Sequence, residues 1–281
     1  MICIPKATVK HQSSEPIYIL TEKGGPLEYI SASRVNCWMS CRRKFYFRYV
    51  KKLSSAPSPP LHVGKVVHSV LQVWNHARWA KKPMARIDLQ KCFYTSWDSE
   101  LMLHPVTWKA EKDELTQCEH AWKVIETYLD TQSIPEEELL EGVEVRLEAE
   151  IEGLPPLLGI VDLVREGGRI VDFKTAAKTP NEETAEFTHS TQLAMYALLY
   201  REATGRTESG LELHHLIKTK QPKVVVQTIA PVADDKINDL TETLHRYVDA
   251  VIDEDWTPSP NFMCGSCDYF KQCSKWKGGG A

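Results

Sequence analysis

The stretch GIVDLVREGGRIVDFK, residues 159–174, contains two short apolar runs separated by a pair of glycines. Both runs are rich in β-branched residues, which favour buried strands, and each carries one aspartate, Asp162 or Asp172. A carboxylate within a buried strand is costly unless a cation or a polar partner neutralises its charge. Because Mg²⁺ and Mn²⁺ prefer oxygen ligands, the stretch predicts a β-hairpin that binds a divalent metal ion.

The length of the turn decides whether the two aspartates can share one ion. A two-residue turn at Gly167-Gly168 would pair Asp162 with Phe173 and would direct the two aspartates to opposite faces. We therefore expect a three-residue turn with a glycine at positive φ, or a β-bulge near Asp162. Lys174 lies on the same face as Asp172 and can hold a water or a phosphate oxygen. The competing interpretation is a polar hairpin with surface carboxylates.

This hairpin resembles the motif of the PD-(D/E)XK nuclease superfamily, in which an Asp is followed by Asp or Glu, any residue and Lys. Four further strings resemble, in the expected order, the RecB-like branch of that superfamily. They are Ser31-Ala32-Ser33, Cys41-Arg42-Arg43-Lys44-Phe45, Gly64-Lys65-Val66-Val67-His68 and Gln192-Leu193-Ala194-Met195-Tyr196. The resemblance spans residues 31–276.

The resemblance implies a metal-dependent DNA exonuclease that hydrolyses phosphodiester bonds in single-stranded or end-exposed DNA. One or two Mg²⁺ or Mn²⁺ ions would be held by four groups: His68, Asp162, Asp172 and the backbone carbonyl of Phe173. Such ions neutralise the charge that develops on the phosphoryl and leaving oxygens. The competing interpretation of His68 is an ordinary helix histidine with satisfied hydrogen bonds.

Three further polar residues are expected beside the metal. Lys174 would orient or help to deprotonate the attacking water. Gln192 and Tyr196 lie one helical turn apart and would position the scissile strand or the lysine, although core packing is an alternative for Tyr196. Glu144 belongs to an alternating strand whose glutamates we assign to a solvated face, so it is left out of the predicted site despite its rough position near the metals.

Cysteines form a second pattern, with Cys264, Cys267 and Cys273 near the C-terminus and Cys37 and Cys41 far upstream. These thiols predict a metal-binding site that links the two ends of the chain. Their spacing alone does not distinguish a zinc ion from an iron–sulfur cluster. The resemblance to AddB-type and CRISPR-associated nucleases implies a structural [4Fe–4S] cluster with Cys41 as the fourth ligand. Cys37, four residues earlier on a helix, stays the alternative.

A basic run, RRKFYFRYVKK at residues 42–52, ends the helix that we predict for residues 31–52. Basic side chains can contact phosphates, and the interleaved aromatics can stack on unpaired bases. The candidate DNA contacts are Arg42, Arg43, Lys44 and Arg48. In the alternative interpretation, the aromatics pack inward and the basic residues are merely solvated.

Composition predicts the cellular setting. The 281 residues are 42% hydrophobic, and no apolar run approaches the ~20 residues that span a bilayer. The N-terminus has no signal-peptide pattern, so we expect a cytoplasmic protein, encoded by a cell or a phage, with reduced thiols rather than four disulfides. The net charge of −4 is not typical of a DNA-binding protein, which leaves the local basic run as the electrostatic signal.

The order of expected elements predicts an α/β fold. A central mixed sheet, flanked by helices and similar to the restriction-endonuclease core, would carry N- and C-terminal segments stapled together by the cluster. We divide the chain into an N-terminal extension, 1–30, and a single nuclease domain, 31–281. Within that domain, 64–140 is a helical insertion, 141–230 is the catalytic sheet core, and 231–281 is the C-terminal helix and cysteine cluster.

Two other functions stay open. The chain could be a non-catalytic DNA-binding or assembly subunit, although the intact Asp162, Asp172 and Lys174 count against this. It could also trim DNA for CRISPR adaptation with a partner integrase, and the catalytic motifs do not separate that role from recombination or repair.

Overall fold

The computed structural model describes residues 23–131, 133–135 and 137–276, which fold into two compact units. The sheet unit consists of the described residues in 56–147 and 160–232. The cysteine unit consists of the described residues in 23–55, 148–159 and 233–276. Most of the predicted N-terminal extension lies outside the described residues, and the division of the chain into an extension and one nuclease domain stays a prediction.

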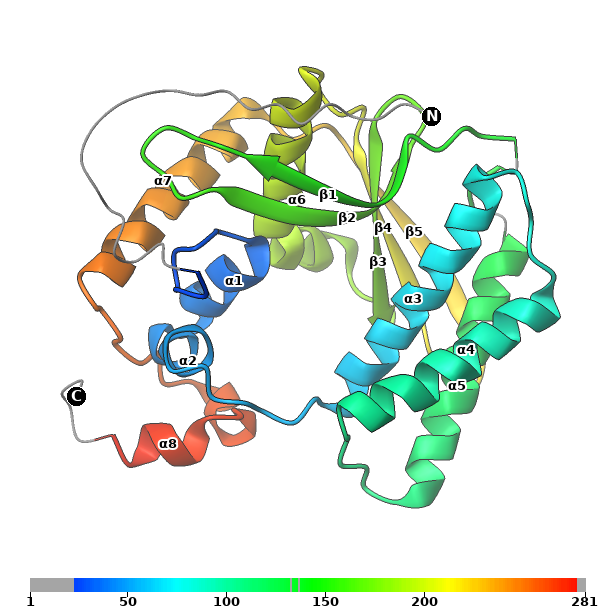
Figure 1. Ribbon diagram of the computed structural model, residues 1–281, viewed down its shortest axis with the longest axis horizontal. Coiled ribbons are helices and arrows are strands. Elements are labelled where there is room, and N and C mark those ends of the chain that lie inside the picture. Colours follow the sequence, from blue (N-terminus) through cyan, green and yellow to red (C-terminus); the bar gives the residue numbers. More distant parts are fainter. Residues whose placement is uncertain (1–22, 132, 136, 277–281) are drawn as a thin grey trace. The chain divides into compact units, whose positions relative to one another are not determined.

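Five strands form one mixed sheet in the order β1-β2-β3-β4-β5 (Figure 1). The strands are β1 (Gly142–Ala149), β2 (Leu157–Arg165), β3 (Arg169–Ala176), β4 (Leu211–Ile217) and β5 (Lys223–Ile229). β2 and β3 are antiparallel, β3 and β4 are parallel, and β4 and β5 are antiparallel. All seven residues of β4 are buried, as expected for an interior strand that is covered on both faces.

Three long helices cover one face of the sheet. They are α3 (Pro59–Trp79), α4 (Arg86–Leu103) and α5 (Glu111–Thr131), coloured cyan to green in Figure 1. Their buried side chains form one apolar core with Val171 and Phe173 of β3. The helical stretch that the sequence predicts after residue 64 therefore builds the main core of this unit.

The fourth helix of the sheet unit, α6 (Glu182–Thr204), contacts the opposite face. Side chains alternate along a strand, so Asp172 and Lys174 point away from the face that Val171 and Phe173 bury. Both polar side chains contact Gln192 of α6. The predicted α/β core, a mixed sheet with helices on both faces, is confirmed.

The turn between β2 and β3 has the length that a shared site requires. Arg165 pairs with Arg169, which leaves a three-residue loop, and Gly167 and Gly168 both have a φ of 76°. Left-handed backbone of this kind favours glycine. A Cβ atom at Gly168 would lie only 2.1 Å from the hydroxyl oxygen of Tyr200, so glycine is also needed for space. The prediction of a three-residue turn with positive φ is confirmed.

This register brings the two aspartates to one face. The pairing ends at Leu163 with Val171, whose side chains both lie in the apolar core, so the adjoining residues Asp162 and Asp172 both project to the other face. Residues that face each other across antiparallel strands project to the same side. The two carboxylates therefore belong to one site.

The cysteine unit is built mainly from short helices. They are α1 (Ala32–Ser40), α2 (Arg42–Phe45), the π-helical turn η1 (Tyr46–Val50), α7 (Asp234–Ile252), the 3₁₀ turn η2 (Phe262–Ser266) and α8 (Phe270–Ser274). The continuous helix predicted for residues 31–52 is wrong at one point, because Cys41 is extended, with φ −171° and ψ 114°, and separates α1 from α2. Tertiary packing of the aromatic run that follows overrides helix propensity here.

The aromatic residues of the basic run pack inward. Phe45, Tyr46 and Phe47 are buried, and the last two form an apolar cluster with Tyr269. The inward packing that we considered as an alternative is therefore confirmed for these three side chains, which are not available to stack on bases.

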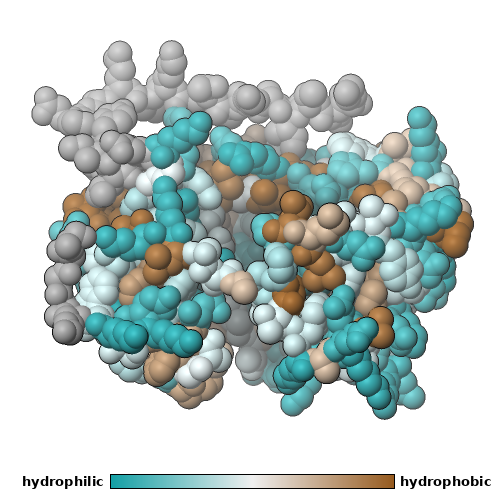
Figure 2. All heavy atoms as spheres, turned by 60° about the horizontal axis from the view of Figure 1, so that its bottom comes forward, coloured by the Kyte–Doolittle hydropathy of each residue, from teal (hydrophilic) through white to brown (hydrophobic). Residues whose placement is uncertain are grey.

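The surface seen in Figure 2 is largely hydrophilic, with hydrophobic residues in separate patches. Exposed apolar side chains include Met102 and Leu103 at the end of α4, and scattered exposure of this kind is ordinary in folded proteins. Among the described residues, no helix has both the length and the apolar character needed to cross a bilayer.

Candidate active site

The candidate active site lies where β2 and β3 stop pairing. The backbone N–H of Phe173 donates a hydrogen bond of 2.7 Å to Oδ2 of Asp162, so this carboxylate takes the place of a ladder partner. Asp172 is 3% exposed, and its Oδ2 lies 2.7 Å from the ammonium nitrogen of Lys174. The two aspartates and the lysine of the sequence motif therefore lie together.

His68 joins the site from α3. Its Nδ1 lies 3.2 Å from Oδ1 of Asp162, and its ring meets the ring of Phe173 edge-on at a centroid distance of 6.1 Å. The histidine is 94 residues away from Asp162 along the chain, so the contact depends on the tertiary fold. The structure thus brings His68 to the aspartates, as the motif order predicts.

Gln192 connects the remaining predicted residues. Its Oε1 accepts a hydrogen bond of 2.7 Å from Lys174, while its Nε2 donates to Oδ1 of Asp172 at 3.1 Å and to the hydroxyl oxygen of Tyr196 at 2.8 Å. One amide thereby fixes an ammonium, a carboxylate and a phenol. Tyr196 is buried, so it packs in the core and belongs to this hydrogen-bonded set as well.

Burial and mutual repulsion dominate the electrostatics of the site. Burial, reinforced by the charge of Asp162, raises the pKa of Asp172 to about 6, although the Lys174 ammonium opposes the shift. Burial alone would lower the pKa of His68, but its hydrogen bond to Asp162 and the charges of both aspartates shift the pKa upward. Burial and the two carboxylates also raise the pKa of Tyr196. The site therefore has an excess of negative charge that added positive charge would relieve.

Glu144 on β1 interacts electrostatically with Asp162 and His68 of this site, although the sequence pattern assigned it to a solvated face. It is partly buried, and burial together with the charge of Asp162 raises its pKa, while nearby His68 opposes the rise. Its φ of 49° is left-handed, which is uncommon for a residue other than glycine. This backbone conformation interrupts the alternation of the strand. No signal in the sequence marks such an interruption, and only the rough position of the residue pointed to the site.

The donor set fits Mg²⁺ or Mn²⁺. It offers carboxylates and an imidazole, and Asp172 Oδ2 has no well-aligned hydrogen-bond donor among the described residues, its charge partner being Lys174. In the described part of the chain, however, no three His, Cys, Asp or Glu side chains converge closely enough to share an ion. Binding would require His68 or Lys174 to release the carboxylates that they contact.

The predicted cluster ligands all lie in the cysteine unit. The sulfur of Cys41 accepts a hydrogen bond of 3.5 Å from the backbone N–H of Ser259, and the sulfur of Cys264 accepts one of 3.3 Å from the N–H of Asn261. Backbone N–H groups that point to sulfur stabilise thiolate ligands. Cys267 and Cys273 pack against the aromatic cluster of Tyr46, Phe47 and Tyr269.

Cys37 differs from Cys41. Burial raises the pKa of Cys37 to about 11, with Lys44 and Arg48 acting in the opposite direction. A thiol that resists deprotonation is a poor metal ligand, and in the described residues only the sulfur of Cys41, of these two, has a backbone N–H directed at it. The environment of the two sulfurs therefore favours Cys41 as the upstream ligand.

The candidate DNA contacts of the basic run also make contacts within the cysteine unit. Arg42 forms an ion pair with Asp255, and Arg43 donates a hydrogen bond of 3.1 Å to the carbonyl oxygen of Trp256. Arg48 lies 5.4 Å from the ring centre of Tyr49. These side chains are therefore not simply solvated.

Comparisons with known proteins bear on the fold and on the family. A solved structure from Eubacterium rectale, described as a candidate exonuclease, covers 97% of this chain and 97% of its own, with a TM-score of 0.61 and 15% sequence identity. At this identity the likeness shows the fold alone. The solved structure of SSO0001 covers 83% of this chain and 92% of its own, at 14% identity and a TM-score of 0.36, too low to support an argument. No curated protein matches the sequence.

The family comparison is decisive because it covers most of the chain. The model of the PD-(D/E)XK nuclease superfamily matches residues 29–274, which include the hairpin, His68, Gln192 and the cysteines near both ends of the match. The mixed sheet flanked by helices is consistent with the restriction-endonuclease-like core of that superfamily. We conclude that the chain belongs to the PD-(D/E)XK nuclease superfamily.

Proposed function

We propose that the protein is a Mg²⁺- or Mn²⁺-dependent deoxyribonuclease that degrades single-stranded or end-exposed DNA as an exonuclease. The observation that carries the proposal is the connected set of contacts from Asp162 and Asp172 through Lys174 to Gln192 and Tyr196. A purely structural ion pair has no need of a second buried carboxylate that raises the pKa of the first.

We assign the metal ligands to His68, Asp162, Asp172 and the backbone carbonyl of Phe173, with Glu144 as an added carboxylate. A bound divalent ion would supply Lewis-acid stabilisation of the charge on the phosphoryl and leaving oxygens. The hydrogen bond from the Phe173 N–H to Asp162 fixes the backbone there, so that its carbonyl has a defined direction.

The remaining residues position the reactants. The Lys174 ammonium, held by Gln192, lies beside Asp172, where it can donate a hydrogen bond to the attacking water or to a phosphoryl oxygen. Gln192 restricts the rotation of the lysine side chain, and Tyr196 restricts Gln192. Each fixed dipole or charge lowers the cost of reorganisation in the transition state.

We also propose that Cys41, Cys264, Cys267 and Cys273 hold a structural [4Fe–4S] cluster, in an intracellular protein whose thiols stay reduced. The N–H groups directed at two of these sulfurs support the assignment. Four thiolates would suit zinc as well. Anaerobically purified protein should show a broad visible absorption band that oxidation removes, whereas colourless protein with stoichiometric zinc would contradict the cluster.

The test of the nuclease is cleavage of DNA labelled at either end, in Mg²⁺, Mn²⁺ or EDTA, by the parent and by Lys174→Ala. Lys178→Ala, which changes an exposed lysine four residues later, is the matched control. We expect metal-dependent cleavage by the parent and the control only, with a ladder of shortened products that reveals the polarity. Products of defined internal length would indicate an endonuclease.

If cluster-loaded parent protein binds DNA but does not cleave it, the function moves to a non-catalytic DNA-binding or assembly subunit. A role in trimming DNA for CRISPR adaptation, or in recombination or repair, would predict in addition a stable complex with an integrase or a recombination protein.

A further inference from the structure

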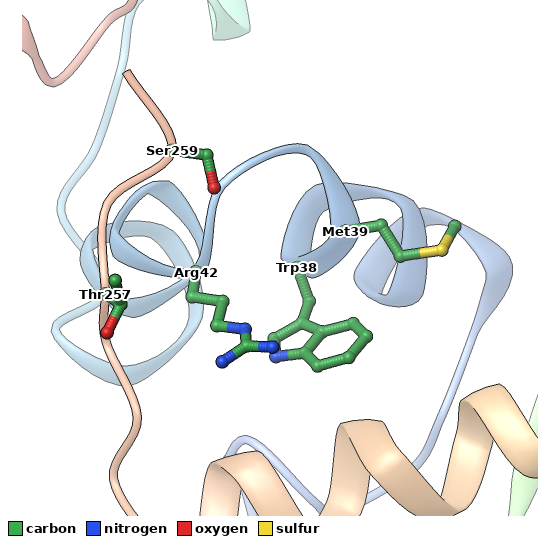
Figure 3. A pocket seen from close by; sticks show the side chains of 5 residues that line it. All are labelled: Trp38, Met39, Arg42, Thr257 and Ser259. Carbon is green, nitrogen blue, oxygen red and sulfur yellow. The ribbon is translucent and has the colours of Figure 1, made fainter.

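A cavity of about 470 Å³ lies in the cysteine unit. Its lining comes from the end of α1, the start of α2 and the segment between α7 and η2, and consists of Trp38, Met39, Arg42, Thr257 and Ser259 (Figure 3). The volume falls within the roughly 300–1,000 Å³ that is usual for small-ligand sites. No cysteine lines the cavity, and none of the five residues belongs to the candidate active site.

Trp38 contributes an unsatisfied donor to this cavity. Its side chain is nearly buried, with 7% of the residue exposed, and its Nε1–H has no hydrogen-bond partner among the described residues. The guanidinium of Arg42 lies 5.1 Å from the centre of the indole ring, and Figure 3 shows it next to the nitrogen-bearing edge. Because both groups are donors, neither can satisfy the other. The missing partner is an acceptor.

The positive charge of Arg42 indicates that the missing acceptor is an anion. Arg42 forms an ion pair with Asp255, whose Oδ1 also accepts a hydrogen bond of 3.1 Å from the backbone N–H of Thr257. A guanidinium has five N–H groups, so this carboxylate leaves donors of Arg42 free for a second anion. The hydroxyls of Thr257 and Ser259 add two more potential donors. A group with several oxygens and a negative charge, such as a phosphate, matches this set.

We propose that the cavity binds a phosphate of the DNA strand, with the Trp38 indole N–H and the Arg42 guanidinium as donors. The inference rests on the proposed nuclease function and adds to it a DNA contact separate from the catalytic residues. Met39, which is 45% exposed at the edge of the cavity, would contact the adjoining sugar or base. The Asp255 carboxylate competes with the phosphate for Arg42 and so limits the affinity.

Because Asp255 competes with the phosphate, its variant should change the DNA affinity in the opposite direction to the variants of Arg42 and Trp38. Binding of a short fluorescent single-stranded oligonucleotide to the full, cluster-loaded protein is measured by anisotropy in EDTA, where cleavage cannot occur. Arg42→Gln is expected to weaken binding roughly 10-fold and Trp38→Phe several-fold, because each removes a donor to an anion. Asp255→Asn is expected to tighten binding several-fold, since it frees the guanidinium. Arg42→Gln should also lower the slope of log K against log salt by about 0.7.

Arg246→Gln serves as the matched control, because it changes an arginine of α7 whose side chain is 75% exposed. We expect less than about a twofold effect. If Arg42→Gln and Trp38→Phe bind as the parent does, the cavity takes no part in DNA binding and the proposal is wrong. If all three cavity variants weaken binding alike, the ion pair of Arg42 is merely structural, and the proposal is again wrong.

Oligonucleotides with and without a 5′-phosphate identify the source of the phosphate. A loss confined to the 5′-phosphorylated strand assigns the cavity to a terminal phosphate, and an equal loss with both assigns it to an internal one. Parent protein that cleaves DNA while its cavity variants bind normally would overturn only this inference. Parent protein that neither binds nor cleaves DNA would overturn the proposed function together with it.

Discussion

Asp172 on β3 and Glu212 on β4 are two buried carboxylates on neighbouring strands of the sheet unit. Their pKa values shift in opposite directions. The two residues are 3% and 5% exposed, and burial by itself raises the pKa of both. Glu212 receives hydrogen bonds of 2.9 and 2.8 Å from Arg165 and lies 2.9 Å from Nε2 of His214. These partners outweigh burial and lower its pKa.

At Asp172 the partners do not outweigh the effect of burial on the pKa. Burial raises its pKa to about 6, Asp162 adds to the rise, and the opposing charges of Lys174 and His68 do not cancel it. The solvent exposure of the two residues is nearly equal, but the charge of Asp172 suffers more from burial and the charge of Glu212 is better compensated by its partners. A buried carboxylate whose charge is compensated by its partners is typical of structural ion pairs, whereas one whose charge is incompletely compensated is typical of a site that binds cations.

The largest expected effect is on activity and comes from Asp172→Asn. The change removes the charge that we assign to metal binding but leaves an oxygen that can accept the hydrogen bond from Gln192. We expect a loss of metal-dependent cleavage of about 10³-fold or more, equivalent to about 4 kcal/mol. Asp98→Asn, at an exposed position of α4, is the control and should cleave at the parental rate. Near-parental cleavage by Asp172→Asn would remove Asp172 from the catalytic site.

Glu212→Gln should have the opposite result, with lost stability and retained chemistry. It leaves Arg165 without one of its two carboxylates, the other being Glu138, and we expect unfolding in urea to require about 3 kcal/mol less free energy. Glu202→Gln, on the exposed side of α6, should change stability by less than about 0.5 kcal/mol. Unchanged stability in Glu212→Gln would show that the two carboxylates do not differ as we infer.

The dependence of stability on pH should separate the same two residues. The pKa of Asp172 in the folded protein, about 6, lies above its ordinary value of 3.8, so the folded state retains this proton longer than the unfolded state. Its contribution is therefore favourable below about pH 4 and is lost as the pH rises through 6, by an amount on the order of 1–3 kcal/mol. The lowered pKa of Glu212 acts in the other direction, because its contribution is lost on acidification.

Urea unfolding of the parent and of Asp172→Asn, in EDTA at several pH values between 4 and 7.5, checks this expectation. The variant should become more stable relative to the parent as the pH rises. A constant difference between the two proteins over that range would contradict the raised pKa of Asp172.

A smaller effect is expected from Gly168→Ala, which tests the turn that brings Asp162 and Asp172 to one face of the hairpin. Alanine disfavours a φ of 76°, and its Cβ would displace the Tyr200 hydroxyl, for a combined cost of about 1–2 kcal/mol. Because the turn sets the register, cleavage should fall by more than the loss of folded protein explains. Gly205→Ala, at the left-handed end of α6 with open space around it, carries the backbone cost alone. Equal activity losses in both variants would exclude a role for the register.

The hairpin could be predicted from sequence because its information is local. The two β-branched apolar runs, the two glycines and the requirement for one shared face together predicted either a three-residue turn or a β-bulge, and the structure has the turn. Gln192 and Tyr196 could be predicted as a pair because a helix places residues four apart on one face.

Two features could not be predicted because distant residues decide them. Glu144 is partly buried and interacts electrostatically with Asp162, and its left-handed backbone conformation, which no neighbour in the chain requires, interrupts the alternating pattern on which the prediction of a solvated face rested. The break at Cys41 follows from the packing of the next aromatic residues on Tyr269, more than 200 positions later. The helix and strand propensities of neighbouring residues carry no information about either feature.

The parallel pairing of β3 and β4 has a consequence for the synthesis of the protein. A parallel connection needs a crossover, and here the crossover is α6, the helix that carries Gln192. On the ribosome, His68 emerges 94 residues before Asp162, a delay of about 5–20 s at ordinary elongation rates. The amide that holds Lys174 follows later still. A nascent chain therefore has no complete candidate active site until its crossover helix has left the ribosome.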